Sequence, residues 1–217
     1  SFPELKDKIT KTNLSPISIS LPRGTSIQKN PLFLDGLIEV QDEGSQILTF
    51  LVDPKRGTMV ADFCAGAGGK TLGISAMMKN TGRLYAFDIS DKRLANLKKR
   101  LKRSGASNIM PQKIMHENDT KIKRLREKFD RVLVDAPCTG LGTLRRNPDL
   151  KWKHSLESLK ELNIKQSLII NAASKLCKIG AHLIYATCSF LKEENETIVE
   201  NFLSDNINFR VLSPDSI

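Results

Sequence analysis

The chain has 217 residues, 40% of them hydrophobic, which is enough for one domain with a full core. Its 34 Lys and Arg residues outnumber 24 Asp and Glu residues, and the net charge of +10 favours a polyanionic partner such as nucleic acid. No apolar run is long enough to span a bilayer, and the first residues do not follow a signal-peptide pattern. We therefore expect a cytoplasmic protein without a membrane partner.

The four cysteines lie at positions 64, 138, 177 and 188. They form no C-x-x-C pair and have no histidine at metal-ligand spacing, so we expect no metal site. A disulfide framework has little support in a chain of this size, and reduced thiols are expected.

Basic residues are concentrated in three stretches. These are Lys98, Lys99, Arg100, Lys102 and Arg103; Lys121, Lys123, Arg124, Arg126 and Lys128; and Arg145, Arg146, Lys151 and Lys153. Any one such cluster is as often a solvated helix face as a binding surface. Three clusters in one small domain favour contact with nucleic acid.

Residues 1–35 contain four prolines, which prevent a long helix or strand. We predict that they form an N-terminal extension packed on the main domain of residues 36–217. Within the extension, the alternation over residues 17–21 is typical of a short edge strand.

From residue 59 onward, strand and helix patterns alternate regularly. Strands are predicted at residues 59–63, 83–87, 108–114, 131–134 and 181–186, and helices at about 70–79, 91–103, 155–177 and 193–203. Gly180 is predicted to follow the end of the third helix. Glu193, Glu194 and Glu196 are expected near the positive end of the last helix. A final short strand is predicted at 208–212.

This alternation predicts an α/β fold with a doubly wound, mostly parallel sheet. In such sheets ligands bind outside the carboxyl ends of the strands. Five chemically active side chains fall at or just beyond such ends: Asp62, Asp88, Asp135, Cys138 and Cys188. The functional site is therefore predicted at this edge.

The turn from Gly66 to Lys70 follows the first of these strands and precedes a helix. It is not a P-loop, because Cys64 stands where the first glycine is required, and Thr71 replaces the last glycine of the dinucleotide fingerprint. Asp88 ends the next strand, at a distance suited to binding ribose hydroxyls. The turn therefore indicates an adenosine-type cofactor, and a simple tight connection is the alternative.

Two cysteines follow the fourth and fifth predicted strands. Neighbouring strands lie about 4.8 Å apart, so Cys138 and Cys188 are expected in one crevice beside the cofactor. A thiolate can add to an electron-poor ring, and a carboxyl such as Asp135 can hydrogen-bond the ring nitrogen. A single cysteine is more often a small buried hydrophobe, and Cys177, inside the third predicted helix, is interpreted in this way.

Several segments match, in order, the motifs of one known family. Residues 62–71 resemble D-x-C-A-x-P-G-G-K-T, with Ala67 in place of the proline, and residues 135–142 resemble D-x-P-C-S-G-x-G. Residues 40–46, 146–149, 151–152, 186–189 and 194–196 match the remaining motifs. The chain thus resembles the Fmu/Sun/NSUN (RsmB-like) family of S-adenosylmethionine-dependent RNA cytosine-5 methyltransferases over about residues 36–203.

The resemblance implies a Rossmann-like class I methyltransferase fold and a transferase reaction on RNA. Cys188 would be the nucleophile that attacks carbon 6 of cytosine, after which carbon 5 takes the methyl group. Cys138 would assist elimination, as a base or by releasing the product. Asp135 would contact the target base near the cofactor, and Lys70 would point into the active site.

The resemblance also implies a binding site for S-adenosyl-L-methionine. Its methionine end would be cradled by Cys64, Ala65, Gly66, Ala67, Gly68, Gly69 and Lys70. Asp88 would bind the ribose and Asp119 the adenine side. Arg93 stands at the family's position in the second helix, where a simple salt bridge fits equally well.

The RNA partner would be ribosomal or transfer RNA, with the target base unstacked. The basic clusters would hold its backbone, and Trp152 would pack at the pocket rim, although a core position is favoured for a single tryptophan. From the resemblance, we expect the strand that closes the family's sheet to be missing before Ile217, and no separate RNA-binding domain before residue 36. We expect a monomeric catalytic core.

Two other functions fit parts of this pattern. One is a noncatalytic RNA-binding relative acting in ribosome assembly, which need not keep Cys188, Cys138 and Asp135. The other is a DNA cytosine-5 methyltransferase, whose nucleophile would be expected in the Pro137-Cys138 motif.

Overall fold

A computed structural model describes residues 9–22 and 24–213. Its centre is a parallel sheet of five strands in the order β5-β4-β3-β6-β7. The strands are β3 (Met59–Asp62), β4 (Arg83–Asp88), β5 (Ile109–Lys113), β6 (Phe129–Asp135) and β7 (Cys177–Ala186). The order reverses at β3, which has β4 on one side and β6 on the other, and this confirms the predicted doubly wound fold.

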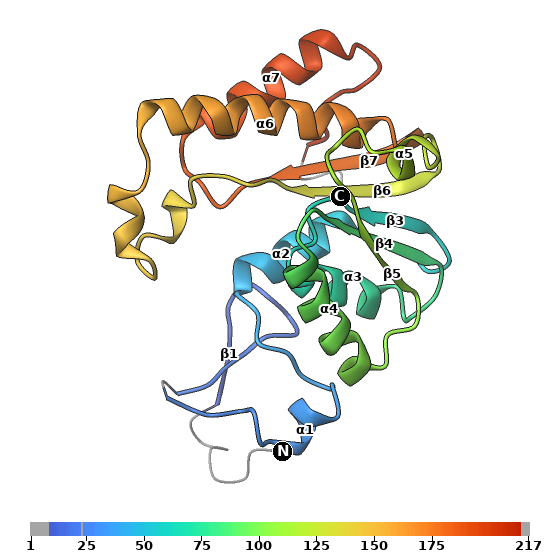
Figure 1. Cartoon of the computed structure of the whole chain (residues 1–217). Helices are drawn as coiled ribbons and strands as arrows, with labels where there is room; N and C mark the ends of the chain where they lie inside the picture. Colours follow the sequence, from blue (N-terminus) through green and yellow to red (C-terminus); the bar gives the residue numbers. More distant parts are fainter. Residues whose placement is uncertain (1–8, 23, 214–217) are drawn as a thin grey trace.

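Helices cover both faces of the sheet (Figure 1). On one face lie α2 (Glu43–Val52), α3 (Gly69–Met77) and α4 (Asp91–Ser104), and on the other α6 (Leu156–Ser174) and α7 (Glu196–Asp205). The short α5 (Thr120–Lys123) packs Ile122 into the same core as α6. Short 3-10 turns lie in the connections after β6 and β7: η2 (Leu141–Thr143), η3 (Pro148–Trp152) and η4 (Lys192–Glu194).

The buried side of each face follows from the alternation of side chains along a strand. In β6, Val132 and Val134 join the core beneath α6, whereas Leu133 joins the core beneath α3 and α4. Such continuous burial on both faces is typical of a central parallel strand. It holds the carboxyl end of β6 in a fixed place, and the functional residues follow that end.

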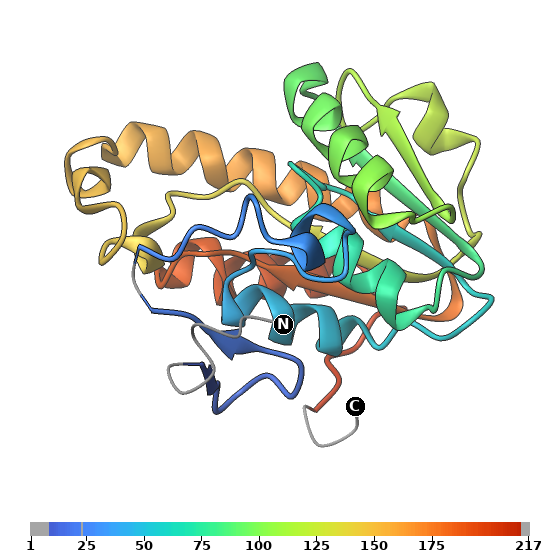
Figure 2. The same ribbon diagram turned by 90° about the horizontal axis from the view of Figure 1, so that it is seen from below.

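The N-terminal segment packs against the helices on the face of the sheet that carries α2, α3 and α4 (Figure 2). Its strand β2 (Ile19–Ser20), within the predicted edge strand, pairs with β1 (Thr10–Lys11) in an antiparallel hairpin. The Glu43 carboxylate at the start of α2 accepts the backbone N–H groups of Leu14 and Ser15, both at 2.9 Å. Toward α1 (Pro31–Leu34), the Arg103 guanidinium lies 4.0 Å from the Phe33 ring centroid.

The boundary between α6 and β7 differs from the prediction. The helix ends at Ser174, and Cys177 is the first residue of β7, not the end of a helix. The carbonyls of Lys175 and Leu176 accept N–H groups from the segment that enters β6, so the chain turns into the sheet there. Gly180, with φ of 78°, lies in an irregularity of the β6–β7 ladder and not at a helix end.

The last predicted elements also need correction. No strand forms over the predicted 208–212 segment; instead Phe209 packs edge-on against Phe202, with ring centroids 5.2 Å apart. The final helix begins at Glu196, and Glu194 turns its side chain inward instead of standing at the helix end. Within the described ranges, no helix has the length and apolar character required to cross a membrane.

Candidate active site

The candidate site lies at the carboxyl edge of the sheet, where β3, β6 and β7 end. Asp135 ends β6 and pairs in register with Ala186 at the end of β7. Three residues after Asp135 and two after Ala186, the Sγ atoms of Cys138 and Cys188 lie 3.3 Å apart. The predicted convergence of the two cysteines is therefore confirmed, and both thiols are free.

The two thiols differ in acidity. The pKa of Cys188 is lowered to about 7, chiefly because the Cys138 thiol donates a hydrogen bond to its sulfur, and Lys70 adds to the effect. Burial and the charge of Asp135 act in the opposite direction. The same contact, together with burial, raises the pKa of Cys138. Cys188 is thus suited to be the nucleophilic thiolate and Cys138 its protonated partner.

An ion pair spans the crevice beside the thiols. Lys70, in the first turn of α3, places Nζ 2.5 Å from Oδ2 of Asp135. Both side chains are largely buried, so their interaction is screened less than a surface pair. The pair provides a cation near Cys188 and a carboxyl group that, when protonated, can donate a hydrogen bond to a ring nitrogen.

The glycine turn leaves open space for a ligand. Gly66 has φ of 56°, and a Cβ atom there would have no neighbour within 4 Å. At Gly68, with φ of 83°, a Cβ would lie 2.1 Å from Leu97 Cδ1, so only glycine allows α3 and α4 to pack here. Arg100 donates to the Ala67 carbonyl at 3.1 Å and steadies the turn from α4.

Asp88 links the glycine turn to the end of β4. Its Oδ2 accepts the Gly66 N–H at 2.8 Å, and its Oδ1 accepts the Ser90 N–H at 2.7 Å. Each carboxylate oxygen keeps a lone pair for a further donor such as a hydroxyl. The Arg93 guanidinium lies 3.8 Å from Asp88 Oδ2 and is mostly exposed. It forms a salt bridge with Asp88, which is the alternative to a cofactor contact that the sequence left open.

The other predicted cofactor residues have different surroundings. Asp119 accepts the N–H groups of Lys121 and Met115, both at 2.9 Å, and these bonds lower its pKa. It therefore organises the loop after β5. Cys64 is partly buried, and burial raises its pKa, so it lines the turn as a neutral thiol.

Asp62 also lies at this site, although the sequence predicted for it only a position at the end of a strand. Its Oδ2 accepts the Thr71 hydroxyl at 2.7 Å, whereas its buried Oδ1 has no hydrogen-bond partner. Burial raises the pKa of Asp62 to about 7. An unpartnered buried acceptor beneath the glycine turn fits an ammonium group such as that of a methionine moiety. In the sequence, the position of Asp62 at the start of the D-x-C-A motif was the signal that could have identified it as a site residue.

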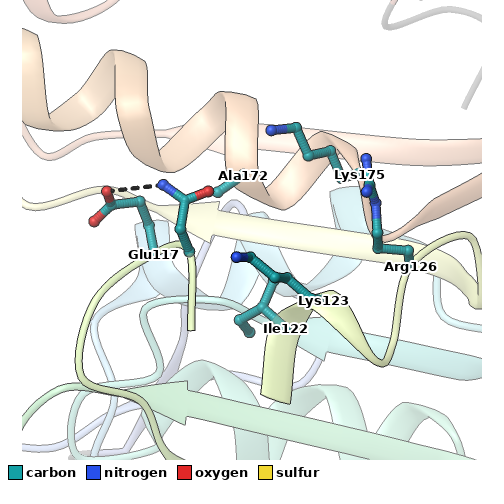
Figure 3. A pocket seen from close by; sticks show the side chains of 7 residues that line it. Glu117, Ile122, Lys123, Arg126, Ala172 and Lys175 are labelled. Atoms are coloured by element: carbon teal, nitrogen blue, oxygen red, sulfur yellow. Dashed lines mark hydrogen bonds between the residues drawn. The ribbon is translucent and has the colours of Figure 1, made fainter. Parts of the chain in front are cut away.

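Figure 3 shows a separate cavity between α5 and α6. Its volume is about 50 Å³, and its polar lining includes Lys123, Arg126 and Lys175. Small-molecule sites usually enclose about 300–1,000 Å³, so this cavity is too small for a nucleoside cofactor. It contains none of the predicted site residues.

The structure changes two expectations about the surface predicted to contact RNA, one for Trp152 and one for the first basic cluster. Trp152 is 81% exposed in η3, not in the core, and Lys151 Nζ lies 4.9 Å from its ring centroid. Within the first basic cluster, Arg100 and Arg103 both pair with Glu39, so they hold the segment that leads into α2. The remaining members of that cluster, Lys98, Lys99 and Lys102, are exposed.

Solved structures identify the class of fold. A methyltransferase homologue from Pyrococcus horikoshii, 32% identical, matches with a TM-score of 0.80 over 94% of this chain and 64% of that chain. NSun6 from the same organism, solved with SFG, is 30% identical with a TM-score of 0.75 over 86% of this chain and 46% of that one. The chain has a Rossmann-like class I methyltransferase fold.

The family model described as 16S rRNA methyltransferase RsmB/F matches residues 49–215, and the chain belongs to this family. The probable ribosomal RNA small subunit methyltransferase B of Synechocystis sp. is 34% identical, over 95% of this chain and 48% of that protein. The chain therefore spans about half the length of the curated relatives it matches.

Proposed function

We propose that this chain is the catalytic core of an RNA (cytosine-5-)-methyltransferase that works through a covalent adduct on Cys188. The observation that carries the proposal is the Cys138–Cys188 sulfur separation of 3.3 Å beside the Lys70–Asp135 pair. Family membership and relatives named for ribosomal RNA methylation support the RNA substrate. We place residues 36–217 in the catalytic domain and residues 1–35 in its extension, and infer a monomer in the cytoplasm.

The proposed cofactor is S-adenosyl-L-methionine, which supplies an electrophilic methyl group when bound. The open side of Gly66 and the unpartnered Oδ1 of Asp62 fit its methionine end. Asp88 holds the ribose, and Asp119 the adenine side. The structure of NSun6 with SFG, an analogue of S-adenosylmethionine, supports this assignment.

In the proposed reaction, the Cys188 thiolate adds to carbon 6 of an unstacked cytosine. As the thiolate adds, the electron pair of the double bond between carbons 5 and 6 makes carbon 5 nucleophilic, and Asp135, in its protonated form, donates a hydrogen bond to the ring nitrogen where charge develops. Carbon 5 then takes the methyl group. Lys70 holds the Asp135 side chain in place until the ring binds.

Elimination then completes the reaction. Once Cys188 is bonded to carbon, it no longer carries the charge that holds the proton on Cys138. The pKa of Cys138 falls from its raised value and its proton passes to solvent. Cys138 then accepts the proton from carbon 5, the bond from Cys188 to carbon 6 breaks, and the ring double bond is restored.

The test is methyl transfer from labelled S-adenosylmethionine to total RNA and, in parallel, to DNA, with wild type, Cys188→Ser and Cys138→Ala. We expect label at carbon 5 of cytosine with wild type, no label with Cys188→Ser, and a trapped protein–RNA adduct with Cys138→Ala. Label that survives in Cys188→Ser contradicts the assigned nucleophile. Label found in DNA instead of RNA favours a DNA enzyme, and binding of RNA and cofactor without label favours a noncatalytic role.

A further inference from the structure

A buried carboxylate lies behind the thiol pair. Glu194 is 0% exposed, and its oxygens accept the Thr139 N–H at 2.9 Å and the Thr139 hydroxyl at 2.5 Å. Thr139 directly follows Cys138. Both donors of this one residue are therefore held by Glu194, which comes from the turn before α7.

The same carboxylate is connected to the other side of Cys138 through α6. The Gln166 amide donates to Glu194 Oε1 and to the Pro137 carbonyl, both at 2.9 Å. Pro137 directly precedes Cys138. The backbone on each side of Cys138 is thus fixed by Glu194 or by its partner Gln166.

The neighbouring Asn195 holds the loop of Cys188 in the same way. Its Oδ1 accepts the Thr187 hydroxyl at 2.7 Å, and its Nδ2 donates to the Ser189 carbonyl at 3.1 Å. Thr187 and Ser189 flank Cys188. The hydroxyls of Thr139 and Ser189 also lie 3.2 Å apart, which joins the two loops directly. Two consecutive residues therefore hold both cysteine loops.

The charge of Glu194 is held by neutral groups. In the part of the chain that the structure describes, no Lys or Arg forms an ion pair with it. Burial raises its pKa, but hydrogen bonds from Ser189, Thr139 and Gln166 lower the pKa below its ordinary value. Burying an ionised carboxylate is costly, and packing alone is better served by an apolar side chain. The presence of a buried carboxylate at this position is therefore explained by its hydrogen bonds, which connect the two cysteine loops.

We propose that Glu194, with Asn195, is a positioning residue that sets the separation of the Cys138 and Cys188 sulfur atoms. It touches neither sulfur and acts through Thr139, Gln166 and the two loops. The consequence for catalysis rests on the proposed function, whereas the consequence for the thiols does not. Replacing the carboxylate by an amide leaves one acceptor oxygen for the two Thr139 donors, so the Cys138 loop loosens and the thiol–thiolate hydrogen bond lengthens and weakens.

The test follows the alkylation of Cys188 by iodoacetamide against pH, read by peptide mass spectrometry without RNA or cofactor. The titratable groups beside Cys188 are Cys138, Lys70 and Asp135. In wild type we expect a midpoint near pH 7. In Glu194→Gln we expect it to rise by about one pH unit, so that alkylation at pH 7 falls about fivefold. In a Cys138→Ala background, the same substitution should add no further shift, because the hydrogen bond is already gone.

Two controls separate positioning from general loss of stability. Glu193→Gln changes an exposed neighbour and should leave the midpoint in place. Phe202→Leu weakens the buried face of α7 and should lower the melting temperature without moving the midpoint. If Glu194→Gln does not fold, Thr139→Val removes only the hydroxyl donor and should move the midpoint in the same direction.

An unchanged midpoint in folded Glu194→Gln overturns the proposal, and so does an equal shift in Phe202→Leu. The readout involves no methyl transfer, so the outcomes can be told apart. If the wild type transfers no methyl group but Glu194→Gln still shifts the Cys188 midpoint, the positioning role is retained and the proposed function is lost. If the wild type is active but Glu194→Gln does not shift the midpoint, the proposed function is retained and the positioning role is lost.

Discussion

The ionisation of Cys188 depends on a few side chains around it. The hydrogen bond from Cys138 lowers its pKa most, Lys70 lowers it further, and Asp135 raises it. Because these groups are partly buried, their charges are weakly screened, and single substitutions should have measurable effects. Lys70 and Asp135 are expected to act in opposite directions.

Lys70→Met removes the cation and keeps the length of the side chain. We expect the pKa of Cys188 to rise above 7, because Asp135 then acts on the thiolate without a counterion. Alkylation of Cys188 near neutral pH should slow. Asp135→Asn is the matched variant and should lower the pKa of Cys188. Shifts of the same sign in both variants, measured by iodoacetamide kinetics against pH, would contradict this account.

Asp62 should make the stability of the fold depend on pH. Its pKa in the folded state is about 7, above the ordinary value of 3.8, so the folded state binds more protons between these values. The contribution of Asp62 to stability is therefore full at low pH and is lost as pH rises through 7. We expect Asp62→Asn to reduce this loss by on the order of 1–4 kcal/mol, measured by urea unfolding at pH 5 and pH 8. An equal effect of the substitution at both pH values would refute the prediction.

At the scale of elements, η3 presents an aromatic ring to solvent. Trp152 is the only tryptophan of the chain and lies beside Lys151. An exposed ring next to basic side chains is typical of a stacking platform for single-stranded bases. The preference of tryptophan for cores was overridden here, because the residue lies in a short turn outside the packed layers.

We expect a single-stranded RNA oligonucleotide to quench the fluorescence of Trp152, since no other tryptophan contributes to the signal. Trp152→Ala should weaken RNA binding by about 1–3 kcal/mol. Its effect on stability should stay within about 0.5 kcal/mol, because the side chain is exposed. Trp152→Phe should retain most of the binding. Quenching that is absent while RNA binds elsewhere would remove Trp152 from the interface.

The boundary between α6 and β7 illustrates how far an element can be predicted. The apolar and small residues before Cys177 continue a helical pattern, and Gly180 suits a helix end equally well. The helix ends earlier because the carbonyls of Lys175 and Leu176 bond to the segment entering β6. Those partners lie about fifty residues away along the chain, so no local pattern reports them.

At the scale of the whole molecule, the net charge is +10, and its basic side chains are of two kinds: some form ion pairs that hold the fold, and others are exposed. Arg100 and Arg103 are paired with Glu39, whereas Lys98, Lys99 and Lys102 on the same helix are exposed. Clustering in the sequence did not distinguish these groups. The free lysines are the better candidates for phosphate contact.

The triple variant Lys98→Gln, Lys99→Gln and Lys102→Gln should weaken RNA binding and flatten its dependence on salt. Each lost contact to single-stranded RNA lowers the slope of log K against log salt by about 0.7, so three contacts lower it by about 2. Fluorescence anisotropy at several salt concentrations measures this slope. Gln substitution at Lys79, an exposed lysine at the end of α3, is the control and should leave the slope unchanged. An unaltered slope in the triple variant would place the RNA on another face.

The sequence by itself determined the fold class, the order of the five sheet strands and the four long helices after residue 59, and the two cysteines that meet. Periodicity and motif spacing are local properties, and parallel strands bring their carboxyl ends to one edge. Only the tertiary structure decided the buried roles of Asp62 and Glu194, the exposure of Trp152 and the end of α6. Each of these depends on partners distant in the chain, which fix what a side chain can bury and which groups it can bond.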